Sequence, residues 1–149
     1  MIRINRQTDY AIRVVLALSK RETGSRPSSR TIRQEMLIPE AFITRIIARL
    51  ANVNLIHTYT GRNGGLELAC PSSQITLRDV VEAFEGPILL SECMQAKSED
   101  ECPFRNDCPV RSKWGRIQAV LMREMAKITF QDLAEETIEI PFGIMEPSF

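Results

Sequence analysis

The fold is decided by residues 39–68, which read PEAFITRIIARLANVNLIHTYTGRNGGLEL. The first half of this stretch predicts a helix with Pro39 at its first helical position, where the missing N–H costs no hydrogen bond. One face of that helix gathers large apolar side chains, which we expect to be buried: Phe42, Ile43, Ile46, Ile47, Leu50 and Val53. The opposite face is small and flat, with one arginine: Ala41, Thr44, Arg45 and Ala48.

The second half of the stretch predicts a β-hairpin. Strand candidates at 55–59 and 66–68 flank Gly61-Arg62-Asn63-Gly64-Gly65, whose glycines tolerate the positive φ angles of a tight turn. A phosphate-binding loop is the weaker interpretation, because no Lys-Ser/Thr pair or βαβ pattern accompanies these glycines. Helix, turn, helix and hairpin is the order of a winged helix, whose flat helix face fits the DNA major groove.

Two further helices are predicted before this stretch. From residue 8 to residue 20, apolar side chains recur at helical spacing and predict a buried helix: Ala11, Val14, Val15 and Leu18. The turn-rich segment 24–29 then supplies a serine N-cap for a short helix through Ile32 and Met36. The DNA contacts are expected from this short helix, the flat helix face and the hairpin tip: Ser28, Ser29, Ala41, Thr44, Arg45, Arg49, Arg62 and Asn63. An ordinary solvated helix surface is the alternative for these residues.

A long helix is predicted near the end of the chain, after a shorter one from Thr76 to Gly86. It begins at Cys108-Pro109, reaches about Lys127 and carries a seam of apolar side chains: Val110, Trp114, Ile117, Leu121 and Met125. Such a seam needs a cover, either a second copy of the chain or the chain's own core, and the second copy is the more economical choice. A short helical segment is expected at 129–136.

The predicted architecture is mainly α with a small β wing. A winged helix-turn-helix domain occupies 1–86, a cysteine-rich loop 87–108, a dimerisation helix 109–135 and a tail 136–149. The N-terminus lacks the pattern of a signal peptide and no apolar run is long enough to span a bilayer, so we expect a cytoplasmic protein with no membrane partner.

The net charge of zero conceals two oppositely charged halves. Residues 1–65 hold eleven Lys or Arg against four Asp or Glu, whereas residues 66–149 hold eight against fifteen. A basic half suits a polyanion such as DNA, because each neutralised phosphate releases condensed counterions. An ordinary asymmetry between two solvated surfaces is the other explanation.

Three of the four cysteines lie close together in an acidic segment. Cys93, Cys102 and Cys108 are separated by gaps of eight and five residues. Three clustered thiolates can hold an iron-sulfur cluster or zinc, and the expected helix N-terminus favours the thiolate of Cys108. A reversible disulfide is the alternative, although it leaves one thiol unpaired. His57 is expected to be a hairpin residue rather than a ligand, and Cys70 to be structural.

Several of these features together resemble the Rrf2 family of bacterial regulators. They are the start NRQTDYA at 5–11, the wing GRNGG, the run ITLRDVV at 75–81 and the cysteine triplet before a long helix. The resemblance covers residues 1 to about 135 and implies a homodimeric winged-helix regulator, with a repressor favoured, whose iron-sulfur cluster sets its affinity for double-stranded operator DNA. A [4Fe–4S] cluster is favoured over a [2Fe–2S] cluster. The alternative is a winged-helix regulator whose cysteines bind zinc or react as thiols. No enzyme is expected, since a single histidine and no nucleophile motif are present.

The branches of this family differ in the fourth cluster ligand. The IscR branch uses a histidine three residues after the last cysteine, and Arg111 stands there in this chain. The NsrR branch uses an aspartate donated by the partner subunit, and Asp9 occupies the matching place. The cysteine gaps and the sequence Glu101-Cys102-Pro103 are more similar to RirA. The resemblance therefore leaves the signal open among nitric oxide, iron and cluster supply, and Asp9 open between a ligand and a helix cap.

Overall fold

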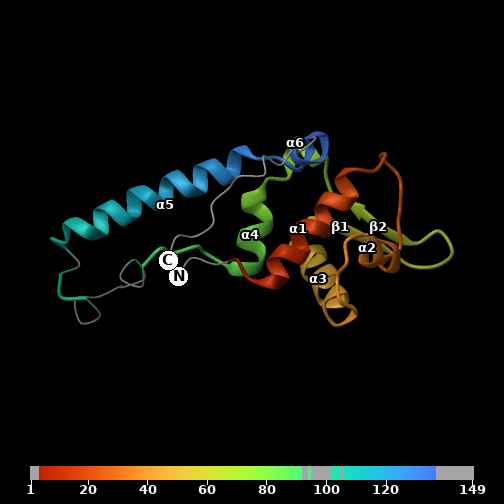
Figure 1. The fold of residues 1–149 in the computed structure, drawn as a ribbon, viewed down its shortest axis with the longest axis horizontal. Helices are drawn as coiled ribbons and strands as arrows, with labels where there is room; N and C mark the ends of the chain where they lie inside the picture. The colour runs from red at the N-terminus through yellow and green to blue at the C-terminus, as the bar shows by residue number, and fades with distance from the viewer. Residues whose placement is uncertain (1–3, 92–93, 95–101, 105, 137–149) are drawn as a thin grey trace, which may run out of the picture.

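The computed structural model describes residues 4–91, 94, 102–104 and 106–136, and Figure 1 shows their arrangement. In chain order the elements are α1 (Arg6–Ser19), α2 (Ser29–Glu35), α3 (Glu40–Asn52), β1 (Ile56–Tyr59), β2 (Gly65–Leu68), the 3-10 turn η1 (Ser72–Gln74), α4 (Leu77–Glu85), α5 (Pro109–Lys127) and α6 (Phe130–Glu135). The two strands pair antiparallel, from Ile56 opposite Leu68 to Tyr59 opposite Gly65. The described chain is mainly helical with a small β wing, as predicted.

Helix α1 forms the centre of the core. Ala11, Val14 and Val15 on its apolar face are fully buried, and α2, α3, α4, α6 and β2 all pack against the helix. It begins at Arg6 because the side chain of Asn5 caps it, accepting a hydrogen bond from the backbone N–H of Thr8 at 2.9 Å. The predicted buried helix is confirmed.

Helix α3 confirms the prediction of two faces and corrects both of its ends. Ile43, Ile46 and Leu50 are buried, and the four residues of the small face are exposed. Pro39 is the N-cap rather than the first helical residue, because its ψ of 142° keeps it extended. The prediction that Val53 is buried was wrong. The helix ends at Asn52, and Val53, as its C-cap, is 42% exposed.

The chain returns to the core after α5 through a short bridge between two helix starts. Thr76 and Thr129 form an isolated antiparallel β-bridge, and each begins a helix with a capping box, α4 and α6 respectively. Backbone hydrogen bonds from Phe130 N to Ile75 O (2.9 Å) and from Leu77 N to Ile128 O (2.8 Å) flank the bridge. These bonds carry α6 onto α1, where the side chain of Phe130 is fully buried.

Helix α5 lies outside this core. None of its residues, all of which are described, is buried. Figure 1 shows the helix projecting from the body, with only its C-terminal part beside α4. Val110 is 56% exposed and Ile117 50% exposed, so burial of the whole seam in the chain's own core is wrong. None of the helices in the described part of the chain combines the length and the apolarity needed to cross a bilayer.

The burial of Phe130 predicts that the short α6 helix contributes strongly to stability. Phe130→Ala should lower the free energy of unfolding by about 3–5 kcal/mol, because it leaves a cavity against α1. Phe104→Ala is the matched control, since this phenylalanine is 73% exposed and its loss should change stability by less than about 0.5 kcal/mol. Urea unfolding followed by circular dichroism measures both. Equal midpoints for the two variants would contradict the assignment of Phe130 to the core.

Candidate functional site

The flat face of α3 stands open on the surface. Ala41, Thr44 and Arg45 are all exposed. In the turn before α3, Leu37 has a left-handed φ of +52°. The side chain of Arg45 rises from a face that otherwise carries only small side chains, because the large ones point into the core. This face can approach another molecule without steric conflict.

The wing is hydrogen-bonded to the segment just before α2. The backbone N–H of Leu66 donates to the carbonyl of Pro27 at 2.9 Å. Gly65, with a φ of +148°, passes so close to this segment that an added Cβ would lie 2.2 Å from the carbonyl oxygen of Arg26. Only glycine fits at this position, and the hairpin is therefore held beside the N-terminal end of α2.

The side chain of Arg26 also links this segment to the wing. Its guanidinium carbon lies 3.6 Å from the centroid of the Tyr59 ring on β1, and its Nε donates to the Glu67 carboxylate on β2 at 3.1 Å. Arg26 is not among the site residues expected from the sequence. Glu67 is 41 residues away along the chain, so no local spacing signals the contact.

A groove of about 410 Å³ lies between the start of α2, helix α3 and the wing. It brings together Ser28, Ser29 and Thr44 with the hairpin residues Tyr59 and Gly61. Ser28 is partly occupied as the cap of α2, because its Oγ accepts the backbone N–H of Thr31 at 3.1 Å. Arg62 and Asn63 are exposed in the turn of the wing.

Arg49, predicted to contact DNA, is attached to helix α4. Its Nε donates to the carbonyl oxygen of Ala83 at 2.6 Å, and its guanidinium carbon lies 5.4 Å from the centroid of the Phe84 ring. The side chain therefore joins α3 to the last turn of α4. A DNA contact from Arg49 stays a prediction.

Two of the three predicted cluster cysteines fall within the described residues, and Cys93 lies outside them. Cys102 and Cys108 are free and half-buried. Cys108 is the N-cap residue of α5, as predicted, yet its side chain makes no capping hydrogen bond. Its sulfur is thus not engaged in capping the helix. This donor chemistry fits a thiolate-bound metal or cluster.

Asp9 lies in the first turn of α1 but does not cap it. Asn5 has that role, so the capping alternative for Asp9 is wrong. Its carboxylate, 49% exposed, accepts from Nη2 of Arg13 at 2.7 Å, and Nη1 of the same arginine donates to the carbonyl of Met36 at 3.3 Å. Asp9 is therefore at the surface, and its partner Arg13 also contacts the turn before α3.

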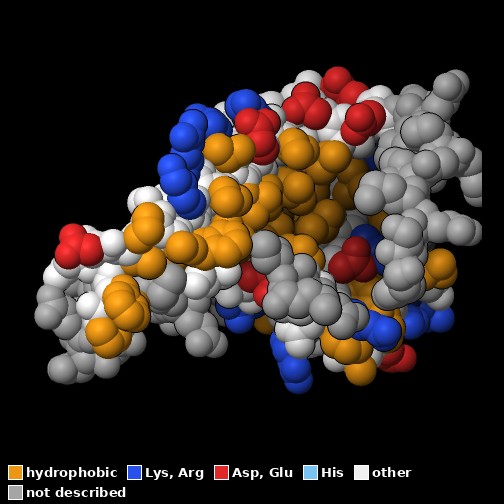
Figure 2. Space-filling view, turned by 60° about the vertical axis from the view of Figure 1, so that its left-hand side comes forward, with side chains coloured by type: hydrophobic (Ala, Val, Ile, Leu, Met, Phe, Trp, Pro, Cys, Tyr) orange, Lys and Arg blue, Asp and Glu red, His pale blue; other side chains and the backbone are white. Residues whose placement is uncertain are grey.

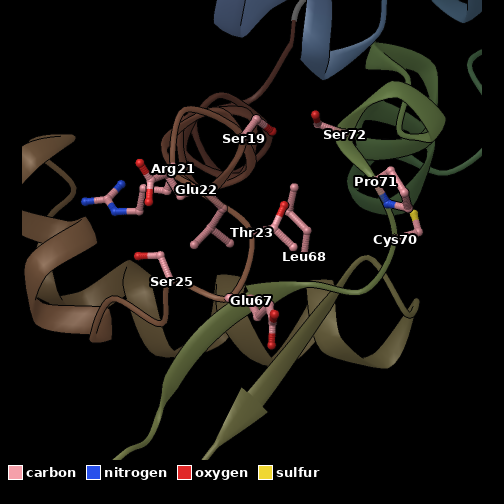
Figure 3. A pocket seen from close by; sticks show the side chains of 12 residues that line it. Ser19, Arg21, Glu22, Thr23, Ser25, Glu67, Leu68, Cys70, Pro71 and Ser72 are labelled. Atoms are coloured by element: carbon pink, nitrogen blue, oxygen red, sulfur yellow. The ribbon is translucent and has the colours of Figure 1, made fainter.

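Cys70 stands apart from the cysteine-rich segment. It lines the edge of a cavity of about 290 Å³ between the C-terminal end of α1, the loop after it and β2, and Figure 3 shows this cavity. Burial, and to a lesser extent the negative charge of Asp79, raise the pKa of the Cys70 thiol. A thiol with a raised pKa is a poor nucleophile and ligand at neutral pH, which fits the predicted structural role.

Residues 4–136 match the family model described as "Rrf2: Iron-dependent Transcriptional regulator". The chain is 31% identical over 149 residues to protein aau3 of Rhizobium meliloti (strain 1021), covering 98% of this chain and 95% of that protein. It is 28% identical over 135 residues to the HTH-type transcriptional regulator NsrR of Geobacillus kaustophilus (strain HTA426), covering 91% of each. Among solved structures it is similar to CymR, the global cysteine regulator of B. subtilis. The TM-score is 0.71, with 25% identity over 90% of this chain and 97% of that one.

Proposed function

The chain belongs to the Rrf2 family of transcriptional regulators, and we propose that it binds operator DNA as a homodimer whose affinity is set by an iron-sulfur cluster. Family membership makes it a regulator and not an enzyme. The DNA-binding part of this proposal rests on the flat, exposed face of α3. The wing lies beside it, held next to the start of α2 by the close approach of Gly65 to Arg26. A repressor is the favoured form.

The shape of this surface supports one mode of docking on DNA. Helix α3 lies in the major groove, where Arg45 reaches the O6 and N7 atoms of guanine. The wing lies over the adjacent backbone or minor groove, where Arg62 neutralises phosphate charge. The excess of Lys and Arg in residues 1–65 supports this placement, since the basic half of the sequence carries both elements.

The homodimer is supported by the exposure of α5. Figure 2 shows hydrophobic side chains gathered in a band on the face of the molecule that includes this helix, with Lys and Arg side chains along one edge. The exposed large hydrophobic side chains on α5 are Val110, Trp114, Ile117 and Val120. A second copy of the same helix covers such a surface with matching apolar side chains, as a two-fold interface requires. Leu121 and Met125 continue the seam towards α4.

The cluster is supported by the chemistry of the cysteine-rich segment. Cys93, Cys102 and Cys108 supply three thiolates, and the partner subunit's Asp9 supplies a carboxylate as the fourth ligand. When bound, the cluster supplies a centre that oxidants, nitric oxide or iron depletion can alter. A carboxylate is a poorer match to iron in a cluster than a thiolate, so Asp9 is the ligand most readily exchanged.

A cluster-free regulator is the second candidate. It is favoured by the structural similarity to CymR, whose described role is global cysteine regulation. In that case the cysteines bind zinc or react as thiols. Anaerobic purification followed by iron and sulfide analysis separates the two, because a cluster protein is brown and contains both elements, whereas a zinc protein is colourless.

Base reading by Arg45 predicts a loss confined to specific DNA. Arg45→Ala should weaken binding to the operator by about 1–3 kcal/mol and leave binding to random duplex nearly unchanged. Arg62→Ala should weaken both and lower the salt dependence, because it removes a phosphate contact. Fluorescence anisotropy at several salt concentrations measures these changes. Equal losses on specific and random DNA for Arg45→Ala would place this arginine outside the base-reading surface.

Pairing through α5 predicts that a charge in the seam separates the subunits. Ile117→Glu places unpaired carboxylates in a dry interface, and sedimentation velocity at micromolar concentration should show a monomer. Ala119→Glu is the matched control, because this exposed residue lies on the opposite side of the same helix. A wild-type protein that sediments as a monomer would remove the basis for the seam.

The proposed ligand set predicts graded effects on the cluster. Cys108→Ala should abolish stable binding of iron and sulfide, whereas Asp9→Ala should leave a folded dimer whose cluster has an altered spectrum and is lost faster to nitric oxide or oxygen. Absorption and electron paramagnetic resonance spectra of anaerobically purified protein measure both. An Asp9→Ala protein with the wild-type spectrum and reactivity would assign the fourth position to another ligand.

A further inference from the structure

The last turn of α4 is bonded to two helices of the DNA-binding head at once. The carboxylate of Glu85 accepts the backbone N–H of Asn5 at 2.9 Å and the hydroxyl of Thr8 at 2.5 Å, both at the N-terminal end of α1. The carbonyl of Ala83 accepts from Arg49 of α3 at 2.6 Å. We call residues 83–85 the coupling turn.

Both attachments are favourable electrostatically. Glu85 places a negative charge at the N-terminal end of α1, and Arg49 places a positive charge at the C-terminal end of α4, which matches the dipole of each helix. Thr8 is fully buried, so its hydroxyl needs its protein partners. Burial by itself raises the pKa of Glu85, but the hydrogen bonds from Thr8 and Asn5 outweigh it and hold the pKa below the usual range, so the carboxylate is charged at neutral pH.

The coupling turn is also the point from which the chain enters the cysteine-rich segment. Gly86 follows at once with a φ of +73°, and residues 87–108 contain the three clustered cysteines. Figure 1 shows the N-terminal end of α1 beside the C-terminal end of α4 at this junction. A displacement at the start of the cysteine-rich segment therefore acts first on the turn that holds α1 and α3.

We propose that the coupling turn transmits the state of the cysteine-rich segment to the DNA-binding helices, with Glu85 and Arg49 as its positioning residues. This inference rests on the proposed function, since it requires a cysteine centre that changes state. Arg49 then acts on DNA through the placement of α3 and not through a phosphate. The two attachments lie on different helices, so the coupling turn sets their relative position as well as the position of each.

Arg49→Lys separates the two roles of this arginine. Lysine keeps the positive charge that a phosphate contact needs, but lacks the Nε–H that bonds to Ala83 and the planar group that lies by Phe84. A phosphate contact predicts unchanged cluster dependence of DNA binding in this variant. A positioning role predicts that the cluster dependence is lost while the salt dependence of binding is kept.

The measured quantity is the ratio of DNA affinities between cluster-loaded and cluster-free protein, on a duplex selected from a random library by the wild-type protein. The wild-type ratio should be about tenfold, in the usual range for coupled sites. Thr8→Val, Arg49→Lys and Glu85→Ala should reduce it to within about twofold of one while iron per chain stays at the wild-type value. Thr8→Ser keeps the hydroxyl and should keep the ratio. Glu82→Ala removes a carboxylate one turn earlier that pairs with Arg78, and it should also keep the ratio.

Hydrogen exchange of the α3 amides in cluster-free protein is the second measurement. It should rise in Thr8→Val and Arg49→Lys and stay unchanged in the two controls. The proposal is overturned if the variants load iron and keep the wild-type ratio, if Glu82→Ala loses the ratio equally, or if α3 exchange is unaltered. A wild-type ratio of one overturns the proposed function, and the coupling with it. A wild-type ratio near ten with unaffected variants overturns the coupling alone.

Discussion

Burial of the apolar face of α1 is the constraint on which the other elements depend. Val14 and Val15 have no exposed surface, and helices from both ends of the chain meet them. Because α1 packs against α3 and β2, the exposed face of α3 and the hairpin take their position from the core. Helix α3 packs its large apolar side chains against the same core as α1 and the hairpin, so mainly small side chains remain on its exposed face.

Several of the polar contacts in the described residues lie at the ends of the helices. Asn5 caps α1, Thr76 and Thr129 begin α4 and α6 with capping boxes, and the β-bridge between these threonines closes the chain on itself. The cysteine-rich segment lies between two such ends, the coupling turn of α4 and Cys108 at the start of α5. Under the proposed function, a change in that segment would act directly on the coupling turn at one end and on the start of α5 at the other.

The exposed α5 helix and the core have complementary roles. The core needs no second copy to bury α1, whereas α5 leaves half of the Ile117 surface uncovered. In the proposed dimer, assembly through α5 would leave the core unchanged and would set the spacing of the two α3 helices, which is the quantity that half-site recognition requires. The partner subunit's Asp9 would then add a cluster contact to the same assembly.

Local sequence patterns were enough to predict the order of the elements, the two faces of α3 and the starts of most helices. These features depend on contacts between residues three or four apart, such as Ser28 with Thr31, so local spacing contains them. Local spacing also suggested a cap at Asp9, because it does not distinguish among neighbouring polar residues that compete for one helix end. Asn5 occupies the cap instead. The three clustered cysteines were visible in the sequence as well. Their expected role came from the resemblance of several motifs together to the Rrf2 family, and not from the cysteine spacing.

The long-range partners of the polar side chains could not be predicted from local sequence patterns. Arg49 was predicted to contact DNA, and its hydrogen-bond partner Ala83 is 34 residues away along the chain. Glu85 meets Asn5 across 80 residues, and Arg26 meets Glu67 across 41. Such pairs have no period along the chain, because they arise only when α1 is buried and the hairpin and α4 are brought against the same core. The physical reason is that tertiary packing, and not spacing along the chain, brings these partners together.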